Sequence, residues 1–106
     1  PERMKAPVKK LNFSEISTLR FEAPDEARFP SLRLAKHALG SGKNSACVLN
    51  AANEVAVHRF LNKEIGFLDI VRVVEATLGK MESFALNSIE DVLSCNARAR
   101  QLAKEV

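Results

Sequence analysis

The sequence predicts an all-α fold: a four-helix bundle-like domain over residues 25–106, preceded by an extended linker and docking arm over residues 1–24. Three observations support this prediction. Apolar residues recur at helical spacing in four segments, short connections containing Gly, Pro or capping residues separate them, and the weak alternation at residues 19–21 is too short to found a sheet. The 106 residues, 46% of them hydrophobic, suffice for one domain with a modest core.

The arm begins with a basic stretch. Residues 1–10 carry four Lys or Arg against one Glu, which accounts for the whole net charge of +3, so the remaining residues sum to zero. A solvated linker explains this charge better than a nucleic-acid interface, which needs basic residues gathered on one docking face. The chain also starts at Pro1 without an initiator Met, so we expect it to be part of a longer polypeptide.

The first two helices are expected over residues 30–39 and 45–61, after a turn near residues 25–28. Pro30 suits a first helical position, and the Gly-Ser-Gly at residues 40–42 ends the first helix. In the second segment, apolar side chains cover more than half of the helix circumference. We therefore expect this helix to be central to the domain.

The third helix is expected over residues 68–80 and the fourth from Asn87 or Ser88 to near the end of the chain. The third has a β-branched run that would also suit a strand, but its length and spacing favour a helix. The fourth can begin with a capping box, because Glu90 and Asp91 each follow a possible capping residue by three positions.

Two amides interrupt the apolar arc of the second helix and make it the best polar candidate. Asn50 and Asn53 fall inside that arc, with Glu54 at its edge. A buried amide needs hydrogen-bond partners, because leaving it unpaired costs roughly 1–3 kcal/mol. A structural polar role, in which the amides bond the backbone of residues 11–24 or of a neighbouring helix end, is favoured over a direct role in binding substrate.

Few other residues are candidates for catalysis or metal binding. Cys47 and Cys95 lack metal-ligand spacing and are expected to be reduced, buried or half-buried thiols in an intracellular setting. His37 and His58 are expected on outer helix faces, without a carboxylate or thiol at ligand spacing. No apolar run approaches the ~20 residues of a membrane span. We therefore expect no catalytic, cofactor-binding or metal-binding residue, and neither a membrane nor a nucleic acid as partner.

Several ordered motifs resemble the C-terminal region of 1-deoxy-D-xylulose 5-phosphate reductoisomerase. They are LRFEAPDEARFPSL at residues 19–32, VLNAANEVAV at 48–57 and IGFLDI at 65–70, and the resemblance covers nearly the whole chain. It implies a domain of an enzyme of the non-mevalonate isoprenoid pathway, which forms 2-C-methyl-D-erythritol 4-phosphate from a phosphosugar with NADPH and a divalent metal, Mn or Mg. It also implies a homodimer of three-domain subunits, in the bacterial cytoplasm or in a plastid if the source is eukaryotic.

The same resemblance implies a mechanical role for this piece. The family's metal carboxylates, phosphate-binding side chains and dinucleotide fingerprint all precede the matching region, so no catalytic position carries over. Apolar residues in a segment without its own core usually belong to an interface. Phe13, Leu19 and Phe21 are therefore expected to form a docking seam with the other domains of the subunit, joined to the second helix by Asn53 and Asn50.

Two other readings stay open. A free-standing helical interaction module would use the basic arm to bind an acidic partner. A helical nucleic-acid binder would need basic residues clustered on one helix, and Arg98, Arg100 and Lys104 are sparse for that purpose.

Overall fold

The computed structural model describes residue 4 and residues 6–106, and over these residues the chain is helical with no strand. Its helices are α1 (Phe13–Ile16), α2 (Pro30–Ser41), α3 (Ser45–Leu61), α4 (Asp69–Lys80) and α5 (Ile89–Glu105). The all-α prediction is confirmed, and α3 has the expected bounds. The short helix α1 was not predicted; the Asn12 side chain caps it by accepting a hydrogen bond from the Ser14 amide at 3.1 Å.

Local sequence explains the ends of the longer helices. Pro30 occupies the first turn of α2, and the helix continues two residues beyond the predicted end because the positive φ of 64° falls at Gly42 rather than Gly40. At the start of α5, the Ser88 hydroxyl accepts from the Asp91 amide, while the Asp91 carboxylate accepts from the Ser88 amide, both at 3.1 Å. This is the predicted capping box.

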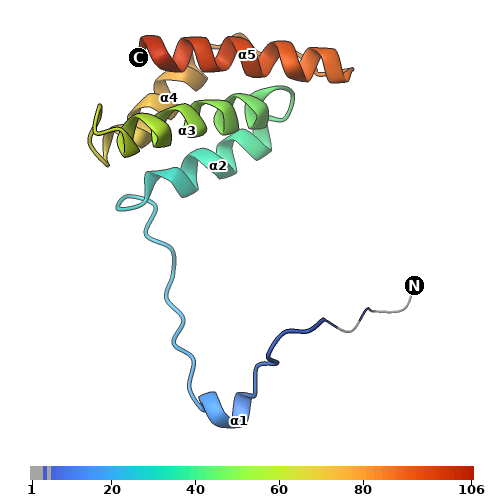
Figure 1. Ribbon diagram of the computed structural model, residues 1–106, viewed down its shortest axis with the longest axis vertical. Coiled ribbons are helices and arrows are strands. Elements are labelled where there is room, and N and C mark those ends of the chain that lie inside the picture. Colours follow the sequence, from blue (N-terminus) through green and yellow to red (C-terminus); the bar gives the residue numbers. More distant parts are fainter. Residues whose placement is uncertain (1–3, 5) are drawn as a thin grey trace.

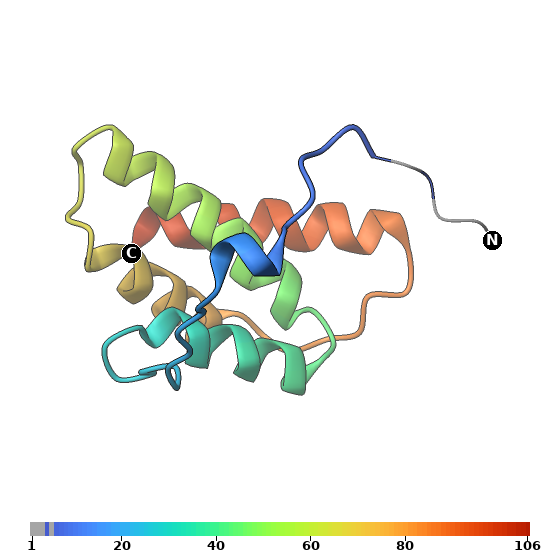
Figure 2. The same cartoon turned by 90° about the horizontal axis from the view of Figure 1, so that it is seen from below.

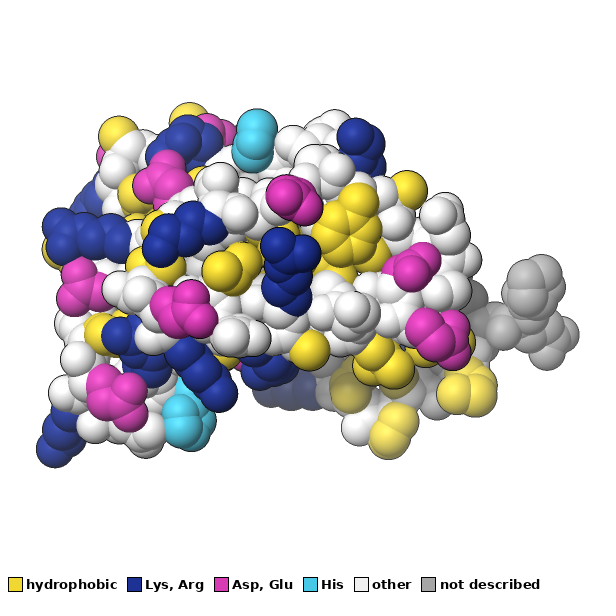
Figure 3. Space-filling view, turned by 90° about the horizontal axis from the view of Figure 1, so that it is seen from above, with side chains coloured by type: hydrophobic (Ala, Val, Ile, Leu, Met, Phe, Trp, Pro, Cys, Tyr) yellow, Lys and Arg dark blue, Asp and Glu magenta, His cyan; other side chains and the backbone are white. Residues whose placement is uncertain are grey.

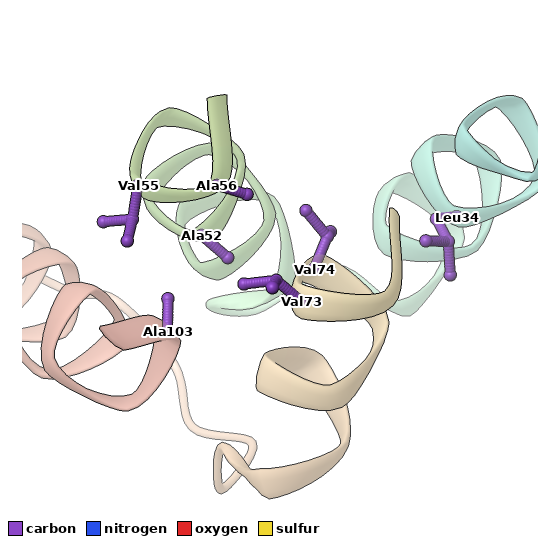
Figure 4. Close-up of a cluster of buried hydrophobic side chains, with 7 residues drawn as sticks. All are labelled: Leu34, Ala52, Val55, Ala56, Val73, Val74 and Ala103. Carbon is purple, nitrogen blue, oxygen red and sulfur yellow. The ribbon is translucent and has the colours of Figure 1, made fainter. Parts of the chain in front are cut away.

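Helix α3 is the centre of the domain. It lies between α2 and α5, with α4 packed against it as well (Figure 1). Figure 4 shows how side chains from the four helices converge on one cluster, formed by Leu34, Ala52, Val55, Ala56, Val73, Val74 and Ala103. The alanines are fully buried, so the backbones of α3 and α5 can approach closely.

A second cluster continues the core along α3 and α5. It contains Val48, Ala51, Met81, Cys95 and Ala99, with Cys47 and Phe84 packed at its edge. Ala51 and Ala99 are both fully buried in this cluster. Leu61 and Leu68 are 69% and 68% exposed, because they lie at helix ends beyond the contacts with neighbouring helices.

The arm runs away from the helices. In Figure 1 it extends from the start of α2 before the chain turns at α1, and in Figure 2, which is seen from below, α1 lies in front of the other helices. Among the described residues, α1 has no contact with any other helix. The division of the chain into a linker and docking arm and a helical domain stays a prediction.

Candidate docking surface

An apolar hollow of about 170 Å³ opens between the start of α2, the middle of α3 and the start of α4. Its walls are almost entirely hydrophobic, and Asn53 and Ser31 are the uncharged polar residues among those that line it. The apolar lining includes Phe29, Leu34, Leu49, Phe67, Leu68 and Val71. Concave, mainly apolar sites with few polar groups are typical of binding surfaces.

A tight turn holds the arm beside this hollow. One carboxylate oxygen of Asp25 accepts hydrogen bonds from the backbone amides of Ala27 and Arg28, at 3.1 and 2.9 Å. The Phe29 amide donates to the Asp25 carbonyl at 2.9 Å, and Lys36 of α2 forms an ion pair with Glu26. The arm therefore leaves the domain at a defined place, next to the hollow.

Aromatic side chains form the rim of the hollow. Phe29 is 51% exposed and Phe67 is 70% exposed, which is unusual for residues that bury so much apolar area when covered. The Arg28 guanidinium lies 5.5 Å from the centre of the Phe29 ring. Phe67 packs edge-on against Phe60, with ring centres 5.8 Å apart. Each ring thus has one neighbouring side chain packed beside it and stays largely exposed.

The prediction that Asn50 and Asn53 face inward is wrong. Both side chains are exposed, because α2, α4 and α5 cover a different sector of α3, where Ala51, Ala52 and Val55 lie. Asn53 lines the apolar hollow, and the hydrogen bonds of the described residues include none from its amide. The predicted contact between Asn53 and residues 11–24 is absent within the described part of the chain.

Asn50 and Glu54 belong instead to a surface network with α5. The Asn50 amide donates to the Glu54 carboxylate at 3.0 Å, and Arg100 forms an ion pair with the same carboxylate. Arg100 also donates to the Asn96 side chain at 2.7 Å. Hydrogen bonds from Arg100 and then Asn50, together with the charge of Arg100, lower the pKa of Glu54 below its ordinary value.

The buried amide of this domain is Asn44, which the sequence reasoning missed. Its side chain is 2% exposed; it donates to the Glu82 carbonyl at 2.9 Å and accepts from the Phe84 amide at 3.3 Å. It thereby fastens the irregular segment between α4 and α5 to the start of α3. The available signal was an Asn directly before a strong helix, at a position where Asn is favoured.

The predicted docking seam is solvent-exposed. Phe13, Leu19 and Phe21 are 71%, 55% and 85% exposed, and α1, which contains Phe13, makes no contact with α3 among the described residues. Surface charges elsewhere are mixed: acidic side chains lie among the basic ones on the face in Figure 3. Over the described residues, no group of three or more His, Cys, Asp or Glu could hold a metal ion, and no helix has the length and apolarity needed to cross a bilayer.

The helical fold, the apolar hollow and the exposed apolar arm define a class of protein: a small all-helical domain with the exposed apolar surface that is typical of interfaces. A family model described as "DXP reductoisomerase C-terminal domain" matches residues 1–102. The chain belongs to this family.

Individual relatives agree with the family model. The chain is 52% identical to 1-deoxy-D-xylulose 5-phosphate reductoisomerase of Rhodospirillum centenum over all of its 106 residues, which is 26% of that protein. It is 48% identical to the Burkholderia multivorans enzyme, of which it covers 27%. A solved structure of the Zymomonas mobilis enzyme in complex with NADPH matches 99% of this chain and 28% of that one, with 45% identity and a TM-score of 0.91. The chain thus spans about a quarter of the length of these relatives.

Proposed function

We propose that this chain is the C-terminal helical domain of a 1-deoxy-D-xylulose 5-phosphate reductoisomerase and that it braces the rest of the subunit. The observation that carries the proposal is the match over the whole chain to enzymes of that name, one of them 52% identical. The complete enzyme would convert 1-deoxy-D-xylulose 5-phosphate to 2-C-methyl-D-erythritol 4-phosphate with NADPH and a divalent metal, Mn or Mg. It would act as a cytoplasmic homodimer on its phosphosugar substrate.

The chemistry of this proposal falls outside the present chain. The described residues offer no cluster suited to a metal ion, and the sequence has no glycine-rich dinucleotide fingerprint. We therefore place NADPH, metal and phosphosugar binding on the preceding part of the polypeptide. In this proposal, the domain stabilises the subunit by packing against its other domains.

The apolar hollow is the surface that we assign to domain docking. Its rim exposes two phenylalanines and Leu68, and covering them would remove a large apolar area from water. Asn53 would then supply the hydrogen bond that fixes the register of the docked segment. Phe13, Leu19 and Phe21 would extend the same contact along the arm.

The activity is tested with the complete polypeptide. Its intact mass, detected through a peptide covering residues 49–57, should be several times that of this 11.7 kDa chain, and it should oxidise NADPH only when the phosphosugar and a divalent metal are present. A mass near that of the chain itself would contradict the proposal and favour an interaction module.

The docking surface is tested by Leu68→Asn in the complete enzyme. Leu68 precedes α4 at its N-cap position, where Asn is favoured, so the helix should tolerate the change. Leu61→Asn is the matched control, because Leu61 is equally exposed but does not line the hollow. We expect L68N to increase proteolytic cleavage of the arm and to lower turnover, with L61N unchanged. Equal behaviour of the two variants would contradict docking at the hollow.

A further inference from the structure

Two cysteines that are distant in the sequence lie side by side in the domain. Cys47 is in the first turn of α3 and Cys95 is near the middle of α5, and both belong to the same packed cluster. The Cys47 thiol donates a weak hydrogen bond to the Val92 carbonyl at 3.7 Å, one helical turn before Cys95. Both are free thiols in this structure.

We propose that Cys47 and Cys95 form an intramolecular disulfide when the protein meets a peroxide, and that this bond links α3 to α5. The inference goes beyond the proposed function, because it concerns the covalent state of the domain rather than its docking. The ligand class is a small hydroperoxide such as hydrogen peroxide. The close approach of α3 and α5 through Ala51 and Ala99 keeps the two thiols together.

The two thiols differ in their access to solvent, and this difference determines which of them is oxidised first. Cys95 is 1% exposed, whereas Cys47 is partly exposed at the edge of the cluster. Burial, followed by the hydrogen bond with the Cys47 thiol, raises the pKa of Cys95 to about 11. Because the thiolate is the nucleophile, Cys47 is the residue that reacts first with a peroxide from solvent.

The reaction balances with one peroxide molecule. The Cys47 thiolate attacks a peroxide oxygen, the O–O bond breaks, and hydroxide leaves with the electron pair of that bond, so that Cys47 becomes a sulfenic acid. The Cys95 sulfur then attacks the Cys47 sulfur, the S–O bond breaks, and the leaving hydroxide takes the Cys95 proton as water. Each sulfur loses one electron, and the products from hydrogen peroxide are one disulfide and two waters.

Peptide mapping tests the bond directly in the complete polypeptide. After hydrogen peroxide treatment, free thiols are alkylated in denaturant and the protein is digested with trypsin without reduction. Cleavage after Lys and Arg places Cys47 in a peptide of residues 44–59 and Cys95 in a peptide of residues 81–98, each with one cysteine. We expect a linked pair of these peptides, two hydrogen atoms lighter than their sum, which dithiothreitol separates. Cys47 oxidised alone, or either cysteine linked to a different partner, would overturn the proposal.

Two variants test which cysteine reacts first and whether disulfide formation depends on the position of the thiol on α3. With Cys47→Ala, loss of the free Cys95 thiol should slow by at least ~10-fold, because the buried thiol then faces peroxide alone. The matched control is the double variant Cys47→Ala and Ala46→Cys, which moves the thiol by about 100° around α3 to an exposed position. This thiol should oxidise without linking to Cys95. Rapid Cys95 oxidation in the first variant, or equal linking in the second, would overturn the proposal. Far-UV circular dichroism checks that both variants are folded.

Discussion

Replacing Asn44 with Ala should destabilise the domain more than any change at the exposed amides of α3. The variant removes a hydrogen bond to the Glu82 carbonyl and another from the Phe84 amide, and it leaves a gap where a 2% exposed side chain had been. A typical intramolecular hydrogen bond contributes about 1 kcal/mol net, and unpaired buried groups cost more. Because Glu82 is exposed and Phe84 is half-buried, water can reach part of the freed backbone. We expect a total loss of about 2–3 kcal/mol.

Urea unfolding followed by far-UV circular dichroism measures this loss. With a slope of about 1–2 kcal/mol per M for a small domain, the midpoint should fall by about 1–3 M. Asn44→Asp should also destabilise, because it keeps an acceptor for the Phe84 amide but offers the Glu82 carbonyl no donor.

Asn53→Ala is the control for this prediction. The Asn53 side chain is exposed on the same helix, so its removal should change the free energy of unfolding by less than ~0.5 kcal/mol. The reasoning would be refuted if Asn44→Ala lost less than ~0.5 kcal/mol, or if Asn53→Ala lost as much as Asn44→Ala.

Three further predictions concern the same unfolding measurement. Ser88→Ala removes the hydroxyl of the capping box and should cost about 1 kcal/mol; an unchanged midpoint would show that the cap adds nothing. Ala99→Leu should cost about 1–3 kcal/mol or more by overpacking the contact between α3 and α5, where Ala99 is fully buried, and a stable variant would mean that the helices can separate. The raised pKa of Cys95 means that the folded state keeps a proton which the unfolded state releases above pH 9.0. Stability should therefore fall as pH rises from 9.0 towards about 11, and Cys95→Ala should flatten this part of the profile.

Helix boundaries could be predicted from the sequence because their determinants are local. Pro30, Gly42 and the Ser88–Asp91 pair act within one turn of the helix that they begin or end. The bounds of α3 were also predictable, since an apolar run of that length between polar connections has few alternatives. The central position of α3 was predictable because apolar side chains cover more than half of its circumference, and the structure confirms this position.

The polar contacts could not be predicted in the same way. The apolar arc of α3 is wider than the sector that its three neighbours cover, and a helical wheel does not say which part stays open. Asn50 and Asn53 fall in the open part, whereas Ala51, which the pattern did not single out, is fully buried. Asn44 was missed because its partners lie about 40 positions later, in an irregular segment whose path depends on the packed fold.

The size of the apolar hollow makes it a possible target for small molecules. A dry cavity of about 150 Å³ lined by aliphatic and aromatic side chains can bind benzene, and the hollow is about 170 Å³. A compact aromatic compound with one amide-pairing group would therefore fit against Phe29 and Phe67 and reach Asn53. On the docking proposed above, such a compound would compete with the part of the polypeptide that covers the hollow.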